Sequence, residues 1–397
     1  MIAFGAAWHI NRHISNTDVR ALRKTLRKLI PPLQPPPEQS IAETLDVDTT
    51  VLLTFRRAGF WYWLKIIMES NSKKDGGHVV RVIPLRLMHD STKSYHQALG
   101  NFLRKTGDKH ASIATSGLED ELKQAIEGVL KGIKGSTVGV ERYLDKVHNL
   151  LIFGEPLSTV VPLSILPGIF KEGQLPNLTQ LTTFDNLLNV EPRLPLSTAA
   201  VFPESGDAYC PRFSENFDKV LTIPPDESRP DSLQQALDHK VHVLHICSPA
   251  LRHPDPNISG IQLGNTILST LDIEKHDMRG VFLVVLANIR GQDYTPDLHF
   301  QNTDLPHAFI KAGAKTVISS YWPVPKDMAR LVFLKFYQLM PLCENDVSSA
   351  LHLAQHWLVN ATVDEINALL KINDVNKEVS TNTYQNPFNQ FAFYTLI

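Results

Sequence analysis

Four short runs of mostly apolar residues constrain the fold of this chain more than any other feature. They read HNLLIF, KVHVLHI, VFLVVLA and KTVISSYW, and segments with helical spacing lie between and after them. Strands of this kind are buried on both faces, and parallel strands need helical connections. The pattern predicts a doubly wound α/β sheet with helices on both faces. Its chemistry is expected just after KVHVLHI and VFLVVLA, beyond the carboxyl ends of the strands.

The helices expected around this sheet have a clear spacing of apolar residues. They include SLQQALD, TDLPHAFIKAG, DMARLVFLKFYQLM and SSALHLAQHWLV, and residues 116 to 134 also have helical spacing. We therefore place the α/β domain at residues 116–397.

Two further units are expected before this domain. Residues 1–45 contain a cationic amphipathic helix at 16–33, followed by the Pro-rich linker PPLQPPPEQ. Residues 46–115 are rich in branched and aromatic residues on both sides of the turn SNSKKDGG, which is typical of an antiparallel β unit.

The charge and hydropathy of the chain exclude some classes of partner. The formal net charge is −2 and the pI is about 6.8, whereas nucleic-acid binding normally requires a dominant basic face. No run approaches the roughly 18 apolar residues of a membrane span. We expect neither a nucleic-acid partner nor a membrane span.

The cysteines and the missing motifs narrow the chemistry. Cys210, Cys247 and Cys343 are odd in number and form no CxxC pair, which predicts neither a disulfide framework nor a thiolate metal site. Phosphate-loop, dinucleotide, HExxH and GxSxG motifs are absent, and the 16 histidines are scattered. We expect no cofactor, no metal, and a cytoplasmic location in a reducing compartment.

The segment KVHVLHICSPALRHPDPNISGIQL resembles the CHAT family of caspase-like peptidase domains, in which a strand runs into VLHLATHG and then PxxSxLxL. The matching residues are Val243, Leu244, His245, Pro256, Ser259, Ile261 and Leu263. Downstream, FLVVLANIRG is similar to the family's LVVLSACETG, and AFIKAGAKTVISSYWPV to its AFLAAGAxSVVASLWPV. Weaker likenesses involve LLIFGEPLSTVVPLSILP, SSALHLAQHWL and NPFNQFAFYTLI. The resemblance implies a caspase-like fold.

The chain departs from the family at both catalytic positions. In the family, the second histidine of HLATHG is the general base and the cysteine of SACETG is the nucleophile. These positions are occupied here by Pro249 and Asn288, and shifting the second alignment by one residue gives Ile289. None of these side chains can supply the missing nucleophile or base. The resemblance therefore implies a catalytically inactive pseudo-peptidase that acts as a protein-binding, scaffolding or regulatory module.

The alternative is a cysteine endopeptidase with a relocated nucleophile. Cys247 lies two residues before Pro249, with His245 and His253 on either side of it in the sequence. In an extended strand, Cys247 and His245 would stand about 6.5 to 7 Å apart, too far for a hydrogen bond unless the strand bends. His245 matches the non-catalytic first histidine of the family, which favours a structural role.

The expected partner is a protein or a peptide. Arg290 and Asp293 follow the second strand where caspase-like folds shape the substrate pocket, so they are candidates for binding a peptide. Two further candidate partners are an active relative paired with this chain and a larger assembly of which the chain is one subunit.

Overall fold

The fold is known from a computed structural model of the chain. The residues whose structure is described are 49–57, 60–67, 97–98, 121, 124–125, 149–154, 177–181, 196–203, 217–224, 227, 229–251, 259–287, 289–290, 305–320, 324, 326–373, 379–380 and 393–397. The predicted helix at 16–33, the linker after it and the turn SNSKKDGG lie outside these residues. Of the predicted helix at 116–134, Glu121, Gln124 and Ala125 are described, and all three are helical.

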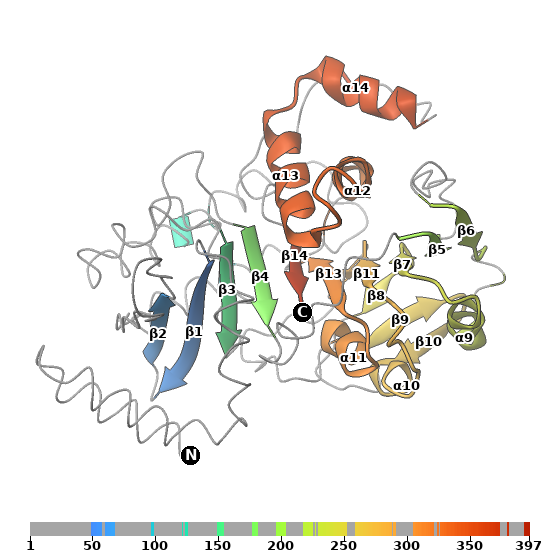
Figure 1. The fold of residues 1–397 in the computed structure, drawn as a ribbon, viewed down its shortest axis with the longest axis horizontal. Helices are drawn as coiled ribbons and strands as arrows, with labels where there is room; N and C mark the ends of the chain where they lie inside the picture. The colour runs from blue at the N-terminus through green and yellow to red at the C-terminus, as the bar shows by residue number, and fades with distance from the viewer. Residues whose placement is uncertain are drawn as a thin grey trace, which may run out of the picture.

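The larger of two sheets has ten strands in the order β2-β1-β3-β4-β14-β13-β11-β7-β5-β6 (Figure 1). Their bounds are β1 Thr49–Arg57, β2 Phe60–Ile67, β3 Asn149–Gly154, β4 Asn177–Leu181, β5 Thr198–Phe202, β6 Lys219–Thr222, β7 Val243–Ile246, β11 Leu283–Leu286, β13 Thr316–Ser320 and β14 Phe393–Leu396. The four apolar runs correspond to β3, β7, β11 and β13. The four predicted strands are thus confirmed, and all four lie in the same sheet.

One half of this sheet is the parallel core that the sequence predicts. The strands β13, β11, β7, β5 and β6 all pair in parallel. Every residue of β7 and β11 is buried, because helices cover both faces of the sheet.

The other half contains β1 to β4. β1 and β2 form an antiparallel hairpin, and β1 also pairs in parallel with β3. The sequence predicts an antiparallel unit that turns at SNSKKDGG, whereas the observed hairpin of β1 and β2 lies wholly before that segment and continues the main sheet.

The described residues also contain six helices whose two ends are both defined. They are α9 Pro230–Asp238, α10 Thr270–Ile273, α11 Leu305–Lys311, α12 Lys326–Leu339, α13 Val347–Asn360 and α14 Val363–Ile372. In Figure 1, α12, α13 and α14 lie above the strands β13, β11 and β7, whereas α10 and α11 lie below them. None of the described helices is both long and apolar enough to cross a lipid bilayer.

A second, smaller sheet has the order β10-β9-β8-β12. Its strands are β8 Ala250–Leu251, β9 Gly260–Leu263, β10 Thr266–Ser269 and β12 Ile289–Arg290. Because β8 follows β7 and β12 follows β11, this sheet begins where the two central strands of the core end. It was not predicted, since its strands have only two to four residues, which is too few for a readable periodicity.

Candidate functional site at the ends of β7 and β11

The ends of β7 and β11 stay side by side as they leave the large sheet. Ile246 is paired with Leu286 at the end of the core, and Ala250 is paired with Ile289 in the small sheet. Three residues separate the two pairs on the β7 side and two separate them on the β11 side. The two segments that the sequence singles out therefore lead into one neighbouring pair of strands.

Pro249 occupies the last position before β8. It is half-buried, and its carbonyl oxygen accepts a hydrogen bond from the backbone N–H of Gln262 at 2.8 Å. This bond ties the end of the β7 segment to β9. The Pro249 side chain has no group that can accept or donate a proton.

Three of the predicted site residues lie outside the described part of the chain, and a fourth is described by its backbone. Asn288, His253 and Asp293 lie outside the described residues. The backbone of Arg290 pairs with that of Leu251 in the small sheet. The role of these four residues therefore remains a prediction.

Cys247 lies between the last residue of β7 and a bend at Ser248. The backbone N–H groups of Cys247 and Ser248 both donate to the carbonyl oxygen of Phe202, at 2.8 and 3.2 Å. The hydroxyl of buried Ser248 donates to the carbonyl oxygen of Pro203 at 3.4 Å. Cys247 itself is a half-buried thiol that packs against the core. The strand is thus no longer regularly extended at Cys247, and its backbone is held by the end of β5.

His245 is buried beneath α12. Its Nδ1 atom forms a hydrogen bond of 3.0 Å with the hydroxyl of Tyr337, and its ring lies edge-on to Phe333 with centroids 5.3 Å apart. Burial lowers the pKa of His245 to about 3, because the imidazolium would lose its hydration. The ring is therefore neutral near pH 7 and poorly suited to take a proton from a thiol.

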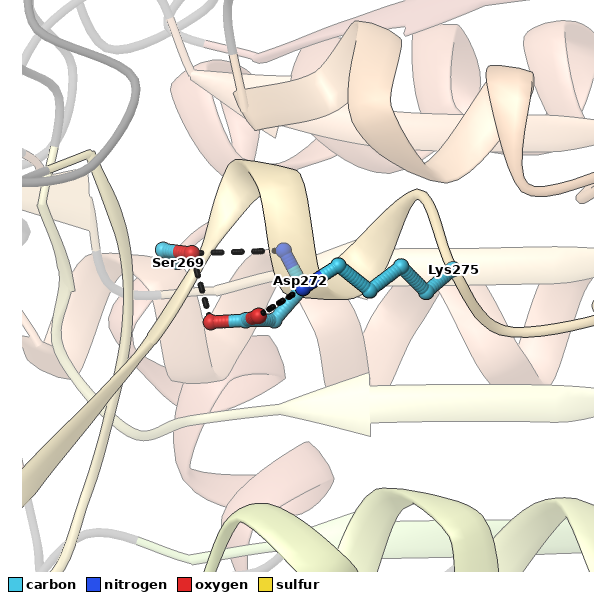
Figure 2. Close-up of polar contacts among 3 residues, drawn as sticks. All are labelled: Ser269, Asp272 and Lys275. Atoms are coloured by element: carbon cyan, nitrogen blue, oxygen red, sulfur yellow. Dashed lines mark hydrogen bonds and ion pairs between the residues drawn. The ribbon is translucent and has the colours of Figure 1, made fainter.

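A polar group beside the small sheet, which the sequence reasoning missed, is shown in Figure 2. The Ser269 hydroxyl caps α10 by accepting from the Asp272 N–H at 3.2 Å, and it donates to the Asp272 carboxylate at 2.6 Å. Lys275 donates to the same carboxylate at 2.8 Å. The hydrogen bonds from Lys275 and Ser269 lower the pKa of Asp272. The S-x-x-D spacing signals such a cap. Ser269, Asp272 and Lys275 bond to one another, which indicates that the group stabilises the start of α10.

Metal ligands do not gather in the part of the chain that the structure describes: no three His, Cys, Asp or Glu side chains there could hold an ion together. What the described residues offer at the strand ends is a neutral, buried histidine, a half-buried thiol and a proline.

The fold is shared with solved structures. The complex of Saccharomyces cerevisiae separase with securin aligns with 100% of this chain and 33% of the separase-complex chain, with 9% identity and a TM-score of 0.55. This chain thus spans about a third of that one. The complex of Porphyromonas gingivalis RgpB pro- and mature domains aligns with 77% of this chain and 76% of its own, with 8% identity and a TM-score of 0.44. No curated protein sequence matches.

The mostly parallel sheet, its helical layers and the likeness to separase define the class: this is a caspase-like α/β fold. A family model described as the CHAT domain matches residues 202–392, which include β7, β11 and the whole small sheet. This part of the chain is similar to the CHAT domain family.

Proposed function

We propose that this chain is a pseudo-peptidase of the CHAT family, which keeps the caspase-like fold as a protein-binding, scaffolding or regulatory module. The observation that carries the proposal is Pro249 at the end of β7, where the family has its general base. Its ring has no titratable group, and its carbonyl is used in holding β9. A side chain of this kind supports a structural role for the strand end rather than acid–base catalysis.

The partner is a protein or a peptide. Separase, whose fold is similar, forms a complex with securin, which favours a protein ligand for a fold of this class. The partner of this chain is an extended peptide, an active relative or a larger assembly, and nucleic acid is not among the expected ligands. We expect the protein to work in a reducing compartment such as the cytoplasm, where thiols such as Cys247 and Cys343 persist.

The second candidate function is a cysteine endopeptidase with Cys247 as its nucleophile. The bend at Ser248 favours it, since only a chain that turns after Cys247 would bring the following His253 back toward the thiol. Against it, His245 is neutral and buried against Tyr337, and its low pKa makes it a weak general base. We therefore rank this candidate second.

Hydrolysis and thiol reactivity test the two candidates together. The wild-type chain and the Cys247→Ser variant are incubated with a mixture of unstructured peptides, and products are counted by mass spectrometry. A thiol-directed electrophile is then used to label the protein at pH 6 and pH 8. For a pseudo-peptidase we expect no turnover and slow labelling of Cys247 at pH 6.

Cys343→Ser provides the matched control, because burial raises the pKa of the Cys343 thiol and keeps it poorly reactive. Hydrolysis that survives Cys343→Ser but disappears in Cys247→Ser would overturn the pseudo-peptidase proposal and establish the endopeptidase.

A further inference from the structure

β14 occupies an unusual place in the large sheet. It lies between β4 and β13, so the strands β1 to β4 are joined to the parallel core through it (Figure 1). It is parallel to β4 and antiparallel to β13, which makes it the strand at which the direction of the sheet reverses. Four residue pairs join it to β13, and two join it to β4. Its pairing with β4 is thus the shorter of the two.

A side-chain amide from α13 extends this short pairing. The Gln355 Oε1 atom accepts from the Phe393 N–H at 2.9 Å, and Gln355 Nε2 donates to the Phe393 carbonyl oxygen at 3.3 Å. Gln355 and Phe393 are both buried, so these backbone groups would otherwise lose their hydration without compensation. The Gln355 side chain thus satisfies the backbone groups of Phe393, at the end of β14 where β4 no longer pairs with it.

Three hydroxyl groups form hydrogen bonds where β4, β14 and α13 meet. Ser348 of α13 lies 2.5 Å from Thr179 of β4 and 2.8 Å from Thr395 of β14, measured between hydroxyl oxygens. Thr395 also donates to Thr179 at 3.4 Å. Thr179 and Thr395 are buried. The two strands and the helix therefore share one polar cluster.

A series of aromatic contacts runs from β14 to the candidate site. The rings of Phe393 and Phe333 have centroids 4.8 Å apart, and Phe333 lies edge-on to His245 in β7. Cys247 follows His245 by two residues. A shift of Phe393 would remove support from Phe333 and, through it, from the end of β7.

We propose that β14 couples two parts of the molecule. The hydrogen bonds of Gln355 keep β14 paired with β4, so that β1 to β4 stay joined to the parallel core, and the same position of β14 supports the end of β7. When β14 loosens, the pairing with β4 opens first and the segment around Cys247 becomes more accessible. This device does not depend on whether the chain hydrolyses peptides.

The test uses the full chain with Gln355→Met, which keeps the length of the side chain and removes its polar atoms. Gln338→Met is the matched control, because Gln338 is exposed on the neighbouring helix α12. Hydrogen exchange is followed by mass spectrometry. We expect amides of β4 and β14 to exchange about tenfold to a hundredfold faster in Gln355→Met alone, with β5 and β6 unchanged. Labelling of Cys247 should accelerate in the same variant.

A second variant, Thr395→Val, removes one hydroxyl of the cluster with little change of shape, and it should give the same local pattern with a smaller amplitude. Equal acceleration in β4 and β6 would overturn the proposal, as would unchanged exchange in β4. If Gln355→Met fails to fold, the pattern in Thr395→Val decides. Loosening of β4 without faster labelling of Cys247 would overturn the link to the candidate site.

Discussion

At the scale of single residues, Gly313 explains why the motif AFIKAGAKTVISSYWPV contains a glycine. The N–H of Gly313 bonds to the Ile310 carbonyl, and the N–H of Ala314 bonds to that of Phe309, which is the Schellman pattern that ends α11. Gly313 has φ of +108°, a conformation that side chains with a Cβ rarely adopt. The Ala-Gly-Ala sequence of the family resemblance therefore marks the end of a helix.

Gly313→Ala is expected to destabilise the fold by about 1–3 kcal/mol, because the backbone conformation is strained for alanine. A Cβ there would also lie 2.9 Å from the Arg279 Cγ atom. Gly280→Ala is the control, since a Cβ at Gly280 would have nothing within 4 Å. Urea unfolding of both variants measures the difference. Equal midpoints for the two variants would show that Gly313 is not constrained in this way.

At the scale of elements, α14 is held at both ends by side chains. Thr362 and Glu365 form a capping box, in which each side chain accepts from the other residue's backbone N–H. At its other end, the side-chain amide of Asn373 donates to the carbonyl oxygen of Leu369 at 2.8 Å. A helix of ten residues would be marginal alone, so these contacts and its buried face stabilise it.

Thr362→Ala should cost about 0.5–2 kcal/mol of helix stability, because the Glu365 N–H loses its acceptor. Thr362→Ser keeps the hydroxyl and should behave much like the wild type. Hydrogen exchange of the α14 amides is the measurement, because it reports local opening. An alanine variant that exchanges no faster than the serine variant would contradict the role of the cap.

At the scale of the whole molecule, a buried and a half-buried histidine make stability depend on pH. Burial lowers the pKa of His245 to about 3, and burial together with neighbouring His356 lowers that of His352 to about 4. In the unfolded chain both would have a pKa near 6.5. The unfolded state therefore binds more protons as the pH falls, so stability is complete above pH 6.5 and declines toward pH 4.

The urea midpoint is expected to fall steadily between pH 6.5 and 4, with each of the two histidines contributing up to about 1.4 kcal/mol per pH unit. His245→Gln removes one of these groups and keeps a polar side chain opposite Tyr337. The pH dependence of this variant should be shallower by about one proton. A slope identical to that of the wild type would show that His245 titrates normally in the folded protein.

Much of the parallel core was predictable because its signals are local. The strands β7, β11 and β13 lie in short, mostly apolar runs of the sequence, and the expected helices appear as α9, α11, α12 and α13. Some of the candidate site followed as well, because sequential strands of such a sheet bring their carboxyl ends together. The small sheet, β5 and β6 were missed, because β8 and β12 have only two residues, β6 is a partly exposed edge strand, and β5 contains two alanines, which are depleted in strands.

The sequence by itself determined the central strands and the long helices of the core, because period and apolar content act over a few residues. It also determined that Pro249, rather than histidine, ends the β7 segment. Only the tertiary structure decided that β14 lies between β4 and β13, and that Tyr337 is the partner of His245. Thr395 and Thr179 are 216 residues apart in the chain, and His245 and Tyr337 are 92 apart. Contacts over such separations depend on how whole elements pack, which no local pattern records.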